Sequence, residues 1–263
     1  MNPTDKNEKV SIIMAAYNAE RTVGNAVRSV LAQTYTNYEL IVIDDCSSDT
    51  TADIVSSFGD SRIRLIRHSR NMGVSLTRHE GAALATARLI AVLDSDDVWE
   101  SDKLRLQIER MAETAADLVF TASTFMSCEG KPIPWTLHVP ERISYRKLLK
   151  QNLISNSSVL VRRDLFIRYE VIDDNIHEDF ACWLRMLNDG YTSVGIDLPL
   201  LHYRLSENSK SSNKWKAMAM NWRTYRAVKL GFFDAMHCMI WYIVNGLLKY
   251  HRLNRHKNRY DIQ

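Results

Sequence analysis

The amino-acid sequence predicts an α/β fold built around a mostly parallel sheet with helices on both faces. Short apolar runs alternate with segments of helical periodicity through the first hundred residues, and strands that alternate with helices of this length form βαβ units. The runs are apolar at consecutive positions, which is typical of strands buried on both faces of a parallel sheet. With 263 residues, 46% of them hydrophobic, the chain can bury the core of one domain of ordinary size.

The elements of the first half follow from these patterns in chain order. Apolar runs predict strands, and apolar positions that recur every three or four residues predict helices. The expected strands are residues 10–16, 38–43, 62–67 and 89–93. The expected helices are residues 20–33, a short helix capped by Ser47 or Ser48, and residues 75–88.

The second half of the chain is less regular. We expect strands at residues 118–125 and 158–161. Helical spacing predicts three more helices, with faces formed by Leu104, Ile108, Met111 and Ala115, by Phe180, Leu184 and Leu187, and by Trp215, Met218, Trp222 and Tyr225. We interpret this half as a continuation of one domain rather than a second fold.

Charge and cysteine content narrow the function classes. The net charge of +3 at pH 7 is more than accounted for by one short basic tail, which carries Lys249, Arg252, Arg255, Lys257 and Arg259. The body of the chain is therefore not expected to bind nucleic acid. Four widely spaced cysteines without a CxxC pair favour free thiols in a reducing cytoplasm, and the polar N-terminus shows no secretory signal.

The sharpest feature is the acidic cluster that follows the run at residues 89–93. Asp94, Ser95, Asp96 and Asp97 would lie at the carboxyl end of a buried parallel strand, where α/β sheets bind ligands. A hard divalent cation best relieves the repulsion between such carboxylates. The alternative is a solvated turn whose aspartates cap the next helix.

A second acidic pair, Asp44 and Asp45, ends the strand at residues 38–43, at the same edge of the sheet. A partly buried carboxylate needs a partner such as a metal ion, a ribose hydroxyl or a nucleobase N–H. The alternative is that one of the two caps the next helix. Because neither GxxxxGKS/T nor GxGxxG is present, a metal ion would have to neutralise any bound diphosphate.

Several segments, in order, resemble the bacterial family 2 glycosyltransferases, which have the GT-A fold. They are VSIIMAAYNAE, SVLAQTYTNYELIVIDDCSSDTT, NMGVSLTRHEGA, LDSDD and HEDFACWLRML. The chain is most similar to the single-addition enzymes that build O-antigen and capsule repeat units, since it lacks the QxxRW motif of processive synthases. The resemblance implies a Rossmann-like GT-A domain over residues 1–213, with a nucleotide-binding half at about 1–100 and an acceptor half at about 101–213.

The resemblance also implies roles in binding the nucleotide. Tyr17 would stack on uracil beside Ala16, and Asp45 would accept a hydrogen bond from the uracil N–H. Arg78 would approach the base or the diphosphate. Without the family match, Tyr17 would be interpreted as a rim aromatic and Arg78 as an exposed helix charge.

The acidic cluster matches the DXD motif of the same family. Asp94 would face the ribose or the metal, and Asp96 would coordinate the Mn²⁺ or Mg²⁺ that bridges the diphosphate, with Ser95 between them at the donor. Asp97 is a further candidate metal ligand. The segment from Leu201 to Ser211 resembles the part of the family that closes over the diphosphate, where Arg204 would offset the charge of the leaving group.

His202, in the same segment, has two interpretations. It is a candidate metal ligand, or a satisfied histidine at a strand end.

The acceptor side of the predicted site is the sequence His177, Glu178, Asp179. A carboxylate at the start of a helix can deprotonate an acceptor hydroxyl, and the resemblance assigns this role to Asp179, with Glu178 orienting the acceptor or the base. His177 and Trp183 are candidate acceptor contacts, Trp183 as a sugar platform. The alternatives are favourable first-turn acids and a core aromatic.

The C-terminal segment, residues 214–263, is expected to form an amphipathic helical appendage. Residues 232–248 are apolar but shorter than a spanning helix needs, and a helix would align Phe232, Met236, Ile240, Ile243 and Leu247 on one side. An apolar stripe followed by a basic tail is typical of peripheral binding to anionic lipid at the cytoplasmic leaflet. The alternative is a helix packed on the domain or on a second copy in a homodimer.

The combined expectation is an inverting glycosyltransferase of O-antigen, lipopolysaccharide or capsule synthesis. It would move one sugar from a nucleotide-sugar, expected to be a UDP-sugar, to a saccharide on a polyprenyl diphosphate. A sugar nucleotidyltransferase would share the fold and the metal, but should carry a glycine-rich basic loop where AAYNAERT stands. A non-catalytic nucleotide-sugar-binding membrane protein would not need the His177–Asp179 pattern.

Overall fold

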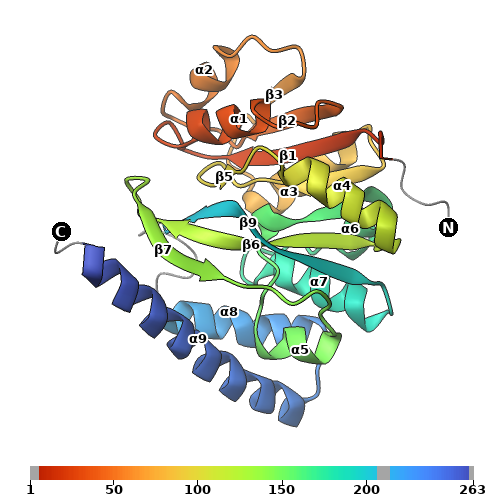
Figure 1. Ribbon diagram of the computed structural model, residues 1–263, viewed down its shortest axis with the longest axis vertical. Helices are drawn as coiled ribbons and strands as arrows, with labels where there is room; N and C mark the ends of the chain where they lie inside the picture. Colours follow the sequence, from red (N-terminus) through yellow and green to blue (C-terminus); the bar gives the residue numbers. More distant parts are fainter. Residues whose placement is uncertain (1–5, 206–213, 261–263) are drawn as a thin grey trace.

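A computed structural model describes residues 6–205 and 214–260 of the chain (Figure 1). Its centre is one nine-stranded sheet with the strand order β3-β2-β1-β4-β8-β6-β9-β5, and β7 pairs with β6 off this path. The strands are β1 Val10–Ala16, β2 Tyr38–Asp44, β3 Ile63–Arg67, β4 Leu89–Val92, β5 Val98–Trp99, β6 Leu118–Met126, β7 Pro132–Leu137, β8 Leu160–Arg162 and β9 Ser193–Arg204.

The first four strands are all parallel, as the sequence predicts. In the register of β1 and β2, Ala16 lies beside Asp44, and in that of β1 and β4, Ile13 lies beside Val92. The carboxyl ends of β1, β2 and β4 therefore meet at one edge of the sheet. This edge is where the two acidic pairs of the sequence leave their strands.

Helices cover both faces of this parallel half. Alternate residues of β1 point to opposite sides: Ile12 packs in one cluster with α1 (Val23–Leu31), whereas Ile13 packs in another with α3 (Val74–Leu84). A short helix, α2 (Thr51–Ser56), follows β2. The continuous apolar runs of the sequence are explained by this two-sided burial.

The second half continues the same sheet. β8 is antiparallel to both β4 and β6, and β6 is parallel to β9. Its helices are α4 Lys103–Thr114, α5 Tyr145–Lys150, α6 Arg163–Tyr169 and α7 Glu178–Asn188, with a 3₁₀ turn at Asn156–Ser158. Both core clusters contain residues of both halves, so the two halves are packed together as one domain.

One local prediction of the sequence is wrong. The helix after β2 begins at Thr51, and neither Ser47 nor Ser48 caps it. Asp49 takes that role, because its Oδ1 accepts hydrogen bonds from the backbone N–H (3.0 Å) and hydroxyl (2.5 Å) of Thr51. The predicted helix with Trp215 and Tyr225 is present, with Tyr225 buried and Trp215 81% exposed.

The C-terminal helices pack on the domain along one side. They are α8 (Lys214–Ala227) and α9 (Phe232–Tyr260), and α9 lies against β7, α5 and α8 (Figure 1). Ala235 and Cys238 of α9 are buried in the main core cluster, and the hydroxyl of Tyr225 in α8 donates to the carbonyl of Leu149 at 2.5 Å. The sequence analysis gave packing on the domain as an alternative to membrane binding for this segment, and the structure shows this packing.

The opposite side of α9 is an exposed apolar stripe. Phe233 is 83% exposed, Ile240 60% and Leu247 58%, and Met236 and Val244 lie between them at helical spacing. We call these five residues the α9 stripe. Among the described residues, no helix combines the length and the apolar character that crossing a membrane requires.

Helix α3 lies unusually close to β1 at Gly81. A Cβ atom at this position would be 2.5 Å from Cγ2 of Ile13, which is inside van der Waals contact. We predict that Gly81→Ala lowers the free energy of unfolding by about 1–3 kcal/mol, because α3 or β1 must shift. Urea denaturation measures this difference.

Gly246→Ala is the matched control, since Gly246 is also helical and a Cβ there meets nothing within 4 Å. It should be neutral or slightly stabilising, because alanine favours helix by up to about 1 kcal/mol. If Gly81→Ala were equally well tolerated, the close approach of α3 to β1 would be contradicted.

Candidate active site

A cavity of about 1390 Å³ opens at the sheet edge where β1, β2 and β4 end. Its walls come from distant parts of the chain: the β1–α1 loop, the start of α3, the loop after β4, the β6–β7 turn and the end of β9. The predicted residues that line it are Ala16, Tyr17, Asp45, Arg78, Asp94, Ser95, Asp96 and Arg204. The structure thus gathers in one cavity all eight residues expected to bind the nucleotide-sugar.

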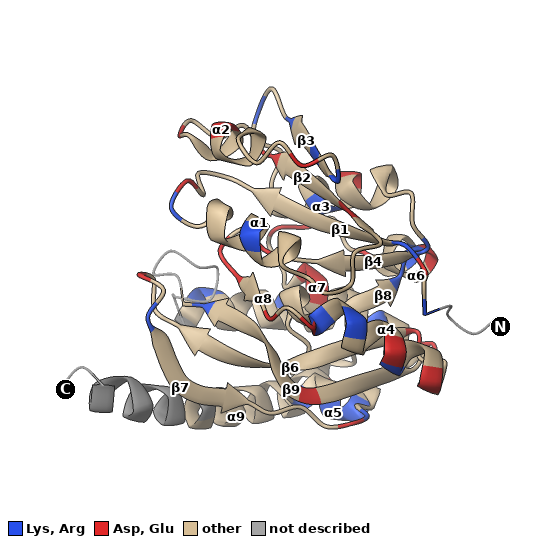
Figure 2. Ribbon diagram, turned by 45° about the horizontal axis from the view of Figure 1, so that its top comes forward, with Lys and Arg blue, Asp and Glu red and all other residues tan. Residues whose placement is uncertain are grey.

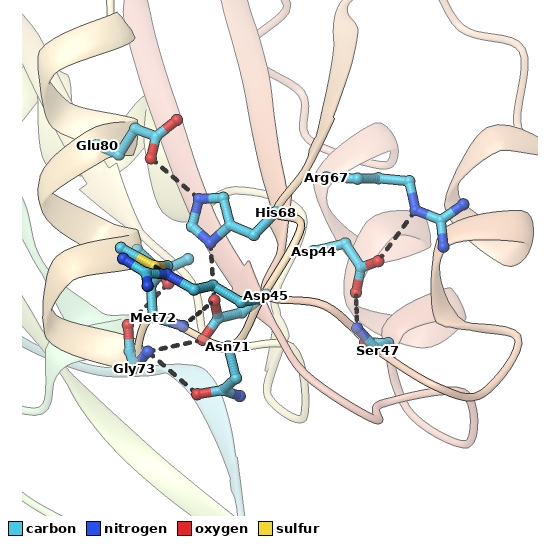
Figure 3. Close-up of polar contacts among 11 residues, drawn as sticks. Asp44, Asp45, Ser47, Arg67, His68, Asn71, Met72, Gly73 and Glu80 are labelled. Atoms are coloured by element: carbon cyan, nitrogen blue, oxygen red, sulfur yellow. Dashed lines mark hydrogen bonds and ion pairs between the residues drawn. The ribbon is translucent and has the colours of Figure 1, made fainter.

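Asp45 is held by a loop that follows β3 (Figure 3). Its Oδ1 accepts from the backbone N–H of Met72 at 2.8 Å, and its Oδ2 accepts from the N–H of Gly73 at 2.9 Å. The ring of His68 lies 2.7 Å from Oδ1. A carboxylate has about four acceptor positions, so one remains for a further donor from the cavity.

His68 bridges two carboxylates, because its other ring nitrogen lies 3.0 Å from Oε2 of Glu80 (Figure 3). Burial alone would lower the pKa of His68, but the hydrogen bonds to Asp45 and Glu80 outweigh it and raise this pKa. A protonated His68 neutralises part of the charge of Asp45. The cavity therefore contains an acceptor whose position is fixed by its neighbours.

Asp44, the other member of this acidic pair, points elsewhere. Its Oδ1 accepts from the backbone N–H of Ser47 at 3.2 Å, and Oδ2 lies 3.3 Å from the guanidinium of Arg67 (Figure 3). It therefore stabilises the turn after β2. Only Asp45 of this pair lines the cavity.

Arg78 joins the acidic cluster to the start of α7. One nitrogen of its guanidinium donates to Oδ1 of Asp94 at 2.5 Å and the other donates to Oε1 of Glu178 at 2.6 Å. Burial would lower the pKa of Arg78, but the negative charges of Asp94 and Glu178 raise it above its usual value. Far from being an exposed helix charge, Arg78 is buried and connects α3 to the loop after β4 and to the start of α7.

The acidic cluster divides between the cavity and the interior. Asp94 and Asp96 line the cavity, whereas Asp97 is buried and its Oδ1 accepts from the backbone N–H of Arg204 at 2.9 Å. Burial and the charges of Asp96 and Asp94 raise the pKa of Asp97 well above its usual value. The sequence analysis named Asp97 as a further candidate metal ligand. Its buried position, away from the cavity that Asp94 and Asp96 line, does not support that role.

Asp94 and Asp96 are suited to hold a divalent cation. Burial, and after it the charge of the neighbouring Asp94, raises the pKa of Asp96 to about 6. Their carboxylate oxygens are the ligands that Mg²⁺ and Mn²⁺ prefer. Within the described ranges no cluster of three or more His, Cys, Asp or Glu side chains could by itself hold a metal ion, so a substrate phosphate would have to supply further ligands.

Arg204 closes this side of the cavity. Its Nε donates to the carbonyl of Asp96 at 2.8 Å, and Nη1 donates to the carbonyl of Cys128 in the β6–β7 turn at 3.1 Å. The guanidinium therefore fixes the acidic loop against that turn while it lines the cavity. The residues expected beyond it, such as Ser206, Ser209 and Ser211, lie outside the described residues.

Glu178 and Asp179 begin α7, where Figure 2 shows acidic residues in red. Glu178 is paired with Arg78, and Asp179 accepts a hydrogen bond from the backbone N–H of Phe180 at 2.7 Å. Burial and the charge of Glu178 raise the pKa of Asp179 to about 7. A carboxyl group whose pKa lies near neutral pH can both accept and release a proton under physiological conditions.

Trp183 and His202 are two further predicted site residues that do not line the cavity. Trp183 is 1% exposed and packs in the core beside Phe166, so the core alternative is correct and the sugar-platform role is wrong. His202 bonds to the hydroxyl of Thr124 (2.6 Å) and to Glu100 (2.7 Å), and is a satisfied histidine near the end of β9 rather than part of the acidic loop.

His177 precedes α7 and is anchored to α8. Its backbone N–H donates to the hydroxyl of Thr224 at 3.0 Å, and the residue is partly buried. It does not line the cavity, so its role toward an acceptor stays a prediction.

The sequence analysis missed several residues that hold Asp45 at the cavity. They include the partners of Asp45, namely His68, Glu80, Met72 and Gly73. The signal for His68 was available, since it directly follows β3 and reaches the same sheet edge as Asp45. Arg21, Thr77 and Glu129 also line the cavity, and the sequence analysis assigned no role to them.

Comparisons with known proteins agree with this geometry. The model of glycosyl transferase family 2 matches residues 11–175. TuaG of Bacillus subtilis (strain 168), whose name provisionally places it in teichuronic acid biosynthesis, is 36% identical over 243 residues, which cover 91% of this chain and 96% of TuaG. WfgD of Escherichia coli, named a UDP-Glc:alpha-D-GlcNAc-diphosphoundecaprenol beta-1,3-glucosyltransferase, is 36% identical over 92% of this chain and 94% of WfgD.

The fold has a solved counterpart in S. aureus TarS 1–349 in complex with UDP-GlcNAc. The TM-score is 0.70 over 89% of this chain and 71% of that one, at 16% identity. This likeness confirms the predicted GT-A architecture. With the family model over most of the sheet and relatives matched over nearly their whole length, the chain belongs to glycosyl transferase family 2.

Proposed function

We propose that this chain transfers one sugar from a UDP-sugar to a hydroxyl of a saccharide on a polyprenyl diphosphate, with inversion at the anomeric carbon. The observation that carries this proposal is that one cavity is lined by Asp45, Asp94 and Asp96, while Asp179 lies close enough to Asp94 for its charge to affect the pKa of Asp179. The names of the Escherichia coli relatives, which specify UDP-Glc and a diphosphoundecaprenol-linked acceptor, support the donor and acceptor classes. The reaction would then serve O-antigen, lipopolysaccharide or capsule synthesis.

The donor nucleotide would bind between Tyr17 and Asp45. Tyr17 is half-exposed at the cavity rim and can stack on a base, while Asp45 has one acceptor position left for an imide N–H. Uracil presents such an N–H, whereas cytosine presents a lone pair at the same ring position. The pocket chemistry therefore favours UDP over CDP.

Asp179 would act as the base that removes the proton of the acceptor hydroxyl. Glu178 is less suited to this role, because its charge is already paired with Arg78. The pKa of about 7 allows Asp179 to take the proton near neutral pH. In a direct displacement, the deprotonated hydroxyl attacks the anomeric carbon from the face opposite the departing UDP.

Asp94 and Asp96 would hold a Mn²⁺ or Mg²⁺ ion next to the donor. When bound, such a cation supplies positive charge that stabilises the departing diphosphate. Arg204, which is fixed at the same side of the cavity by Asp96 and Cys128, would add a second positive charge there.

The α9 stripe would place the enzyme on the cytoplasmic leaflet as a peripheral membrane protein. Exposed large apolar side chains of the described residues are concentrated on α9, where they are Phe232, Phe233, Met236, Ile240, Trp241, Val244, Leu247 and Leu248. A contiguous exposed apolar surface of this kind marks an interaction site. The basic tail that follows in the sequence favours anionic lipid as the partner.

The base assignment is tested by Asp179→Asn. We expect this change to lower kcat about 10²- to 10⁴-fold, because the amide cannot accept the proton. UDP binding should stay unchanged, since Asp179 does not line the cavity. Transfer from a UDP-sugar to a lipid-diphosphate saccharide measures kcat, and Asp189→Asn at the far end of α7 is the control.

The pH profile of the unaltered enzyme provides an independent check on Asp179. Its pKa is raised to about 7 and the base must be deprotonated, so kcat/KM should fall about tenfold per pH unit below pH 7 and level off above it. A profile that is flat from pH 5 to 8 would contradict the assignment.

Nucleotide and metal specificity are tested by calorimetric titration with UDP, GDP, CDP and TDP, each with and without Mn²⁺. We expect Mn²⁺ to strengthen UDP binding at least about tenfold, because the cation offsets the repulsion between the diphosphate and the acidic loop. Asp96→Asn should remove this dependence, whereas Asp102→Asn, a partly exposed acid beyond β5 that does not line the cavity, should retain it. If Mn²⁺ strengthened the binding of none of the four nucleotides, the interpretation of Asp94 and Asp96 as a DXD motif would be rejected.

Membrane binding is tested by substituting the α9 stripe. Ile240→Glu combined with Val244→Glu should weaken binding to phosphatidylglycerol-containing vesicles at least about tenfold, because charges replace apolar side chains at the lipid boundary. Leu198→Glu, at an exposed position of β9, is the control and should bind as before. A self-associating stripe would instead appear as concentration-dependent dimers that the double variant abolishes, with vesicle binding absent throughout.

A further inference from the structure

Helix α3 has no N-terminal cap of its own. The residue before its first turn is Gly73, which has no side chain, and the first turn carries no acidic residue. The first backbone N–H groups of a helix need acceptors from elsewhere. Asp174, in the loop between α6 and α7, supplies one: its Oδ1 accepts from the N–H of Ser75 at 3.2 Å and from the hydroxyl of Ser75 at 2.7 Å.

This contact lies directly beside the nucleobase pocket. Gly73 has φ +86°, and a Cβ atom there would overlap Oδ2 of Asp174, so glycine is required for two separate reasons. The N–H of the same Gly73 donates to Oδ2 of Asp45. The loop that holds Asp45 and the loop that leads to Asp179 therefore meet at one residue.

Two further contacts tie α3 to the same loop. The ring of His79 lies 2.8 Å from Oε2 of Glu170, where α6 ends, and Arg78 donates to Glu178, where α7 begins. Together with Asp174, these contacts hold residues 170–178 to α3 at their start, middle and end. Asp179 is the next residue, so its position is set by α3.

We propose that Asp174 is a positioning residue of the transfer reaction, which caps α3 from the opposite half of the domain and so couples the nucleobase pocket to the base Asp179. This inference rests on the proposed function for the role of Asp179. The coupling itself rests only on the contacts around Gly73 and Ser75. A nucleotide that orders the Asp45–Gly73 contact would also order the loop of Asp174.

The experiment compares Asp174→Ala with Asp174→Asn in the full chain. Alanine removes the acceptor, whereas asparagine retains a side-chain oxygen and caps helices about as well as aspartate. We expect Asp174→Ala to lower kcat about 10- to 100-fold, since a small displacement of a catalytic group has effects of this size. Its KM for the UDP-sugar should change less than threefold, and Asp174→Asn should recover most of kcat.

Hydrogen–deuterium exchange gives a readout that needs no acceptor substrate. In the unaltered protein UDP should slow exchange in peptides that cover residues 170–178, and in Asp174→Ala this protection should be lost although UDP still binds. Asp173→Ala is the matched control, because Asp173 bonds only within its own loop, to Asn175, in the described structure. It should keep both the protection and kcat.

Ser75→Ala provides a second, independent test. It removes the hydroxyl donor, and the double variant with Asp174→Ala should be no slower than Asp174→Ala alone, because the two residues act as one pair. The inference would be overturned if Asp173→Ala lowered kcat as much as Asp174→Ala does. It would also be overturned if, without nucleotide, Asp174→Ala left the hydrogen–deuterium exchange of residues 170–178 unchanged. If the unaltered protein did not bind UDP, the proposed function would be overturned instead. Hydrogen–deuterium exchange without nucleotide would then still test whether Asp174 caps α3.

Discussion

The ion triad of Arg78 with Asp94 and Glu178 is the interaction on which the rest of the site depends. It joins the acidic loop after β4 to the first turn of α7 through one guanidinium on α3. Removing one member of such a buried group leaves a charge without its partner, and this costs more than the group contributes as a whole. Arg78 therefore supports both the acidic loop after β4 and the start of α7, the two parts of the site to which the donor and the acceptor are proposed to bind.

The positions that sequence reasoning placed correctly follow from topology. Parallel strands end at one edge, so Asp45 and Asp94 had to lie close together once β1, β2 and β4 were recognised as parallel. The helix that presents Arg78 was also recognisable from its periodicity. What Arg78 contacts was not, because Glu178 is 100 residues away in the chain and no local pattern specifies its partner.

Where the sequence analysis placed a residue wrongly, it had predicted the helix or turn correctly but not the direction in which the side chain points. Trp183 lies on the predicted helix α7, but on the face that meets the core. Asp97 follows Asp96 directly, yet the turn after β4 points one carboxylate to the cavity and the next to the backbone of Arg204. Motif spacing cannot distinguish these neighbours, since both satisfy the same pattern until the turn geometry is known.

The contact between Asp174 and Ser75 has a consequence for the evolution and engineering of this enzyme. The two residues are 99 positions apart, on opposite sides of the midpoint where a donor half and an acceptor half would be divided. Chimaeras made by crossing two relatives near residue 100 would combine a glycine–serine pair from one parent with a loop from the other. Exchange of acceptor specificity between relatives should therefore succeed when the loop at residues 170–178 is inherited together with α3.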